Sequence, residues 1–138
     1  MSFVVTDASL WMARFVPQDV FHSVVKSWLD ERRAEGTQFL APAYLLPEVG
    51  GVISRRTGDS GLGKQILESL ENLPGLRFVD IDSALLREAA RLAVELGLRG
   101  ADSLYVAVAA RLTIPLVTLD AEQQERSAGT VEIISLEK

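Results

Sequence analysis

Short apolar runs that end in an aspartate constrain the fold of this chain more than any other feature. The first run is Phe3–Val5, which stops at Thr6 and Asp7 and is followed by a helical pattern. A short run rich in β-branched residues and bounded by turn-forming residues is typical of a buried strand. A second run, Leu116–Leu119, leads into Asp120 in the same way. Open α/β sheets bind ligands at the carboxyl ends of their strands, where both aspartates would lie.

Strands alternate with helices along the rest of the sequence. Strands are predicted at 3–5, 38–41, 76–81, 116–119 and 131–136, and helices at 9–15, 18–35, 43–56, 62–73, 84–96, 102–112 and 121–126. This alternation favours a mostly parallel sheet covered by helices on both faces. We therefore predict an α/β fold, a three-layer α/β/α sandwich with a mostly parallel central sheet. The glycine-containing loop expected at 57–63 is too short for a linker, so residues 1–138 are expected to form a single domain.

The composition limits which metals and ligands the chain can bind. There is no cysteine and only one histidine, His22, so a single chain can form neither a thiolate site nor a histidine cluster. A metal site would use oxygen ligands, which favour magnesium or manganese over zinc. The net charge of −5 argues against a general nucleic-acid coat, because such affinity comes mostly from neutralised phosphates. It leaves room for an enzyme that meets the backbone through a bound cation.

Targeting signals are not apparent in the sequence. The first residues lack a basic region, and their apolar run is too short for a signal peptide. No stretch approaches the ~20 apolar residues of a membrane span. The expected location is therefore cytoplasmic, without a membrane partner.

Four acids stand out because of where they fall in the pattern. Asp7 and Asp120 follow apolar strands, Asp102 opens a helix that is apolar on most sides, and Glu48 lies in the apolar stretch 45–53. Charges in such places are costly unless they are paired or bound to a cation. Carboxylates that converge raise one another's pKa, and a divalent cation relieves this repulsion. A metal held there can activate water and neutralise charge on a phosphoryl group.

Each acid also has a purely structural interpretation, which the sequence leaves open. Asp7 and Asp102 could be the N-caps of the helices that follow them. Asp120 could be a turn residue, and Glu48 could be a surface residue on an amphipathic helix.

Other side chains near these acids have supporting roles in the metal-site interpretation. Ser9 lies two residues after the first acid and Thr118 two residues before the last, so each could orient a carboxylate or bind a bridging water. Four arginines near the acids in sequence could touch phosphates or simply face solvent: Arg14, Arg55, Arg56 and Arg99. Four apolar side chains crowd the first helical region, where core packing is favoured over a groove for a partner helix: Trp11, Met12, Phe15 and Phe21.

Four stretches in order, VVTDAS, LLPEV, GADSLYVAVA and LVTLD, resemble the PIN domain. The resemblance covers nearly the whole chain and is greatest to the VapC-type toxins of bacterial and archaeal toxin–antitoxin pairs. It implies a PIN-like fold and a metal-dependent endoribonuclease that hydrolyses RNA phosphodiester bonds with metal-activated water. It also implies an acidic pocket that holds Mg²⁺ or Mn²⁺ and is built from Asp7, Glu48, Asp102 and Asp120, with Thr118 beside the last acid.

The resemblance further implies an RNA substrate, a homodimer and a cognate antitoxin that lays a peptide across the active-site groove. The sequence departs from the family pattern at two places. Gly51 and Val52 stand where many relatives carry a polar residue, and Glu122 and Glu125 stand where another aspartate is common. A second metal is therefore less supported than the first.

Two other functions compete with the nuclease hypothesis. One is a non-catalytic PIN-like binding module, against which the four intact acids argue. The other is a magnesium-binding phosphoacceptor receiver domain, which would need an acidic pair after the first strand and a lysine after the last. Asp7 has no acidic neighbour and Lys138 is terminal, so the receiver interpretation is disfavoured.

Overall fold

The apolar runs of the sequence form the strands of one parallel sheet. The computed structural model describes residues 2–137. In chain order, the elements are β1 (Phe3–Thr6), α1 (Ala8–Phe15), α2 (His22–Ala34), β2 (Gln38–Pro42), α3 (Leu45–Thr57), α4 (Ser60–Glu71), β3 (Leu76–Val79), α5 (Ser83–Leu96), α6 (Gly100–Leu112), β4 (Leu116–Val117), α7 (Ala121–Ser127) and β5 (Ile133–Ile134). The five strands lie in the order β3-β2-β1-β4-β5, and every neighbouring pair is parallel.

The first strand occupies the centre of the sheet and sets its topology. Val4 of β1 lies opposite Phe39 of β2, and Val5 lies opposite Leu116 of β4. The chain thus builds outward from β1 to β3 on one side and later from β4 to β5 on the other. The topological switch point falls between β1 and β4, where a crevice is expected outside the carboxyl ends of the strands.

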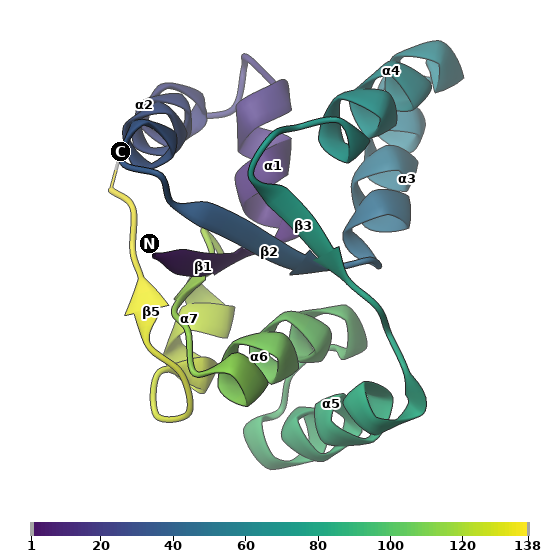
Figure 1. Ribbon diagram of the computed structural model, residues 1–138. Coiled ribbons are helices and arrows are strands. Elements are labelled where there is room, and N and C mark those ends of the chain that lie inside the picture. The colour runs from purple at the N-terminus through teal and green to yellow at the C-terminus, as the bar shows by residue number, and fades with distance from the viewer. Residues whose placement is uncertain (1, 138) are drawn as a thin grey trace.

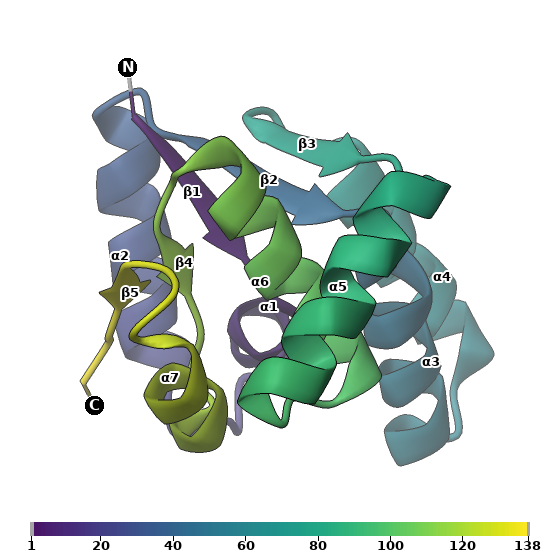
Figure 2. The same ribbon diagram turned by 90° about the horizontal axis from the view of Figure 1, so that it is seen from below.

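Helices cover both faces of the sheet, which confirms the three-layer prediction. Figure 1 shows α1 to α4 on one face and α5, α6 and α7 on the other. Seen from below in Figure 2, α6 lies directly over the central strands and packs against β1, β2 and β4. No helix among residues 2–137 is long and apolar enough to cross a membrane.

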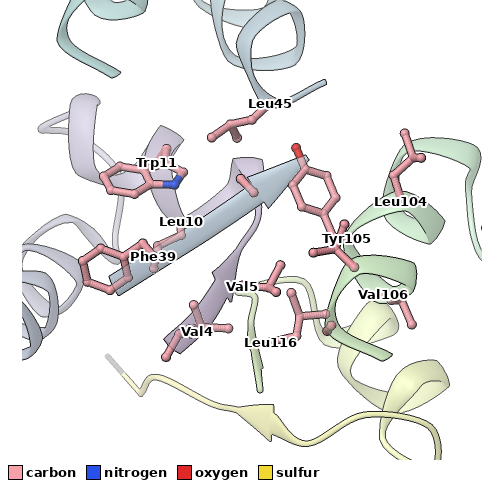
Figure 3. Close-up of a cluster of buried hydrophobic side chains, with 14 of the residues drawn as sticks. Val4, Val5, Leu10, Trp11, Phe39, Leu45, Leu104, Tyr105, Val106 and Leu116 are labelled. Atoms are coloured by element: carbon pink, nitrogen blue, oxygen red, sulfur yellow. The ribbon is translucent and has the colours of Figure 1, made fainter. Parts of the chain in front are cut away.

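Large buried side chains fill the space between α1 and the sheet (Figure 3). Trp11 is 1% exposed, its ring packs edge-on against Phe39 at 6.3 Å, and its Nε1 donates a hydrogen bond to Thr6 Oγ1 at 3.0 Å. Met12 is also buried, and the half-buried Phe15 stacks on Trp11. Core packing is therefore confirmed for Trp11 and Met12.

The predicted helix at 18–35 is wrong at its start, because α2 begins only at His22. Asp19 Oδ1 accepts a hydrogen bond from the Phe21 N–H at 2.8 Å, and this local turn competes with helix formation. Val20, which fitted the helical pattern, is consequently 69% exposed. The ring of His22 meets the carbonyl of Ala13 at 2.8 Å.

The predicted loop at 57–63 is also wrong, because α4 begins at Ser60 and is capped by Asp59. Helix α4 packs against α3, where a Cβ at Gly50 would lie 3.0 Å from Leu67 Cδ2. Gly50 therefore permits this close approach, whereas Gly51 has open space around it. The last two strands are shorter than predicted and contain two residues each.

Candidate active site

Asp7 lies between β1 and α1, beside the switch point of the sheet. Its Oδ1 accepts hydrogen bonds from Ser9 Oγ at 2.6 Å and from the Leu10 N–H at 3.3 Å, so it caps α1. The residue is only 4% exposed. Burial raises the pKa of Asp7 to about 6, against the lowering effect of the Ser9 and Thr118 hydroxyls and the Leu10 N–H; the charge of Asp102 adds to the rise. Asp7 is thus both a cap and a buried acid whose ionised form is costly.

Hydroxyl groups connect Asp7 to the segment that follows β4. Ser9 Oγ donates to Asp7 Oδ1 and accepts the Leu119 N–H at 2.9 Å. Thr118 Oγ1 lies 3.5 Å from Ser9 Oγ and accepts the Asp120 N–H at 3.1 Å. The carboxyl ends of β1 and β4 are therefore held together by side chains that lie between the two acids.

Asp120 caps α7, since its Oδ1 accepts the N–H groups of Glu122 at 2.9 Å and Gln123 at 3.2 Å. Gln123 is 2% exposed and makes two further bonds. Its Oε1 accepts from the Thr118 hydroxyl at 3.2 Å, and its Nε2 donates to the Asp102 carbonyl at 3.4 Å. This buried amide connects the segment that carries Asp120 to the helix that carries Asp102.

Asp102 lies in the first turn of α6, and the N-cap of that helix is Arg99. The alternative that Asp102 is an N-cap is therefore wrong. Burial, followed by the charges of Asp120 and Glu48, raises the pKa of Asp102 to about 6, whereas the nearby Arg99 guanidinium acts in the opposite direction. A carboxylate in the first turn also gains from the positive end of the helix dipole.

Glu48 lies in the first turn of α3 and is half-buried, so the alternative of an ordinary surface residue is wrong. Its Oε1 accepts a hydrogen bond from the Tyr105 hydroxyl at 2.6 Å. Burial raises the pKa of Glu48, and the bond from Tyr105 opposes the rise. Burial and the adjacent Glu48 raise the pKa of Tyr105 far above its usual range, so the hydroxyl keeps its proton and donates.

The four acids are close enough to influence one another. Asp102 is affected by the charges of Glu48 and Asp120, and Asp7 by the charge of Asp102. Carboxylates that raise one another's pKa in a partly buried crevice are the electrostatic setting that a divalent cation stabilises, and their oxygens suit Mg²⁺ or Mn²⁺. Within residues 2–137, however, no three acidic or histidine side chains are already arranged as a metal-binding group. The charges and donor atoms fit a cation, while the side-chain positions are not those of a closed coordination shell.

Two residues of this crevice were absent from the sequence-based hypothesis: Tyr105 and Gln123. Each lies three residues after a candidate acid on the same helix or at its cap, Asp102 and Asp120 respectively. Residues three apart share a helix face, so this spacing was the available signal. A tyrosine within an apolar helix is more readily assigned to the core, which is where its ring does lie.

Comparison with protein families gives one match that covers most of the chain. The model described as "PIN domain" matches residues 4–129. A search of curated proteins gives no significant match.

Solved structures with the same fold include three bacterial proteins. VapC20 of Mycobacterium tuberculosis, described as a sarcin-ricin loop cleaving toxin, has a TM-score of 0.77 and 20% identity over 94% of this chain and 97% of that chain. VapBC2 of Rickettsia felis, bound to a promoter DNA fragment, has a TM-score of 0.75 and 14% identity over 98% and 99%. FitAcB of Neisseria gonorrhoeae has a TM-score of 0.69 and 19% identity over 95% and 96%. At these identities the likeness establishes a shared fold.

Proposed function

Because the chain belongs to the PIN-domain family, we propose that it is a metal-dependent endoribonuclease and the toxin of a VapBC-type toxin–antitoxin pair. The proposal takes residues 1–138 as one nuclease domain. The observation that carries it is the group of coupled, partly buried carboxylates at the switch point of the sheet. The receiver-domain alternative has no support from the family match.

We propose Asp7, Glu48, Asp102 and Asp120 as the residues that hold Mg²⁺ or Mn²⁺. When bound, the cation would supply a Lewis acid that activates water and neutralises charge on the scissile phosphate. The chain's own contribution is to keep the acids fixed while they repel one another. Ser9 and Thr118 hold the ends of β1 and β4, and the burial of Asp7 keeps bulk water away from its carboxylate.

A substrate phosphate must approach a negatively charged crevice, so a nearby cationic side chain is needed. Arg99 is exposed and lies beside Asp102, where its guanidinium can meet a phosphate oxygen. We propose this role for Arg99 ahead of Arg55 and Arg56, which lie in the last turn of α3, far along that helix from Glu48.

RNA as the substrate and an antitoxin as the partner are supported by the family and by the named structures of the same fold. VapC20 is described as a toxin that cleaves the sarcin-ricin loop, and VapBC-5 of Mycobacterium tuberculosis as a member of the VapBC family of toxin–antitoxin systems. By the same reasoning we propose a homodimer that acts in the cytoplasm, where its RNA is found.

Cleavage of a synthetic RNA by the purified protein tests the proposal. We expect cleavage with Mg²⁺ or Mn²⁺, 5′-phosphate and 3′-hydroxyl ends, and no cleavage after chelation. Asp7→Asn and Asp102→Asn should lower the rate by about a thousandfold or more, because several kcal/mol of transition-state stabilisation depend on the cation. Asp80→Asn is the matched control, since Asp80 is exposed just after β3, and it should cleave like the parent.

Equal rates for the Asp7→Asn variant and the parent would contradict the site. Absence of cleavage in the parent under all metal conditions, with the fold intact, would favour the non-catalytic binding module.

A further inference from the structure

Tyr105 is a large buried side chain whose hydroxyl is influenced by three of the candidate acids, Glu48, Asp7 and Asp102. It is 1% exposed, and its hydroxyl donates to Glu48 Oε1 at 2.6 Å. Figure 3 shows the ring standing between α6 and the end of β2, with its oxygen on the side away from the body of α6. A buried tyrosine hydroxyl needs a hydrogen-bond partner, and here the partner is a carboxylate.

The bond between Tyr105 and Glu48 joins the two helical layers of the protein. Tyr105 belongs to α6 and Glu48 to α3, and Figure 1 shows these helices on opposite faces of the sheet. The two residues are 57 positions apart in the chain. Tyr105 therefore spans the carboxyl edge of the sheet and reaches the one candidate acid that lies within a helix of the opposite layer, Glu48 of α3.

Spacing on α6 brings Tyr105 near Asp102. The two residues are three positions apart, so their side chains leave the same face of the helix. The charges of Asp7 and Asp102 both influence Tyr105. One helix thus presents a carboxylate and a neutral donor side by side toward Glu48.

A glutamate needs such a donor more than Asp7 and Asp120 do. Glu48 has an additional rotatable bond, and ordering a glutamate side chain carries a substantial entropy cost. Asp7 and Asp120 are held by backbone N–H groups at helix N-termini. Glu48 is held by a side chain, and a hydrogen bond to a carboxylate is among the stronger ones that proteins make.

We infer that Tyr105 is a positioning residue, whose hydroxyl fixes the carboxylate of Glu48 in the orientation that binds the divalent cation. This inference rests on the proposed function. Tyr105 acts through Glu48, so its removal affects cation affinity only while Glu48 is present. Groups that orient a metal ligand in this way typically contribute tenfold to hundredfold to metal affinity.

A double-mutant cycle in the RNA-free protein tests the inference. Mn²⁺ affinity is measured by titration calorimetry for the parent, Tyr105→Phe, Glu48→Gln and the double variant. We expect Tyr105→Phe to weaken Mn²⁺ binding by about tenfold or more in the parent background. In the Glu48→Gln background the same change should have almost no effect.

Tyr44→Phe is the matched control, because it removes the same atom from the other tyrosine of the chain. Tyr44 is 41% exposed, and Mn²⁺ affinity should be unchanged in this variant. The free energy of unfolding without metal is measured in parallel. A purely structural role for Tyr105 would lower that stability and leave Mn²⁺ affinity unchanged.

Glu48→Asp provides a second test that leaves Tyr105 in place. Its shorter side chain withdraws the carboxylate from the hydroxyl, so Mn²⁺ binding should weaken, and adding Tyr105→Phe should weaken it no further. Equal Mn²⁺ affinity in Tyr105→Phe and the parent would overturn the inference, as would an equal loss in both Glu48 backgrounds. A parent that does not bind Mn²⁺ would instead overturn the proposed function itself.

Discussion

The clefts at the two ends of the sheet differ in volume and in the burial of their charged groups, and only one of them is a candidate site. At the amino ends of β2 and β3 lies an open cleft of about 450 Å³. It is lined by the exposed side chains of Asp30 and Arg33 and by the buried Thr37, whose hydroxyl is 2.8 Å from that of Ser2. At the carboxyl ends, the cleft beside Asp102 and Asp120 is much smaller, about 10 Å³.

The burial of charged groups, rather than the volume of a cleft, indicates which end of the sheet is the better candidate for a reactive site. The charged groups at the amino end face solvent, which screens the interactions between them. At the carboxyl end, Asp7 is almost fully enclosed, and the pKa values of Asp7 and Asp102 are raised to about 6. The small cleft, which lies beside buried acids with raised pKa values, is thus a better candidate site than the large cleft, whose charged groups face solvent.

The largest expected difference between the two ends is stabilisation by a cation. Adding Mn²⁺ to about a hundred times its dissociation constant should raise the free energy of unfolding of the parent by about 2.7 kcal/mol. Asp30→Asn at the amino end should keep this gain, whereas Asp7→Asn at the carboxyl end should lose most of it. Denaturant unfolding with and without Mn²⁺ measures both. If Asp30→Asn abolished the stabilisation by Mn²⁺, the cation would bind at the amino ends of the strands, and the proposed site would be contradicted.

Lowering the pH should stabilise the metal-free protein, because the acids at the carboxyl ends of the strands have raised pKa values. Asp7 has a pKa of 3.8 when unperturbed and about 6 in the folded chain, so the folded state binds more protons between these values. The free energy of unfolding therefore rises as pH falls from about 7 to about 5, by about 1.4 kcal/mol from Asp7. Asp102 adds less, since it is more exposed.

Denaturant unfolding at the two pH values, in the presence of a chelator, measures this gain. Asp7→Asn should remove the part of the rise in the free energy of unfolding that comes from Asp7, whereas Asp30→Asn should leave the rise unchanged. A parent protein whose stability falls between pH 7 and pH 5 would show that Asp7 does not carry a raised pKa.

A pair of matched serine substitutions gives the smallest expected difference. Ser9→Ala at the carboxyl end leaves the Leu119 N–H without its partner, so stability should fall by about 1 kcal/mol. Ser2→Ala at the amino end removes a hydroxyl of an exposed residue that lies 2.8 Å from the Thr37 hydroxyl, and the expected loss is smaller, about 0.5 kcal/mol. Thermal unfolding of the two variants compares them, and equal losses would mean that the hydroxyl network adds nothing specific to the site.

Local patterns in the sequence were sufficient to predict the parallel sheet and the proximity of the four acids. Strands β1 and β2 are apolar runs with sharp ends, and parallel order followed from their alternation with helices. The start of α2 could not be predicted in the same way, because the Asp19 turn depends on a side-chain hydrogen bond that hydrophobic periodicity does not register.

The connections within the candidate site were beyond prediction for a different reason. Tyr105 meets Glu48 across 57 residues, and Ser9 meets Leu119 across 110. Such pairs depend on how the layers are stacked, which no local window contains. The roles of the acids themselves stay predictions until metal binding and cleavage are measured.

The position of β1 has a consequence for protein synthesis. Strand β1 lies at the centre of the sheet, but it can pair with β4 only after the residues between them have been synthesised. Val5 and Leu116, which lie opposite each other, are more than a hundred residues apart in the chain. Asp120 emerges later still. Until Asp120 has been synthesised, the earlier acids lie on an incomplete sheet, so the group of four acids forms only after β4 has paired with β1.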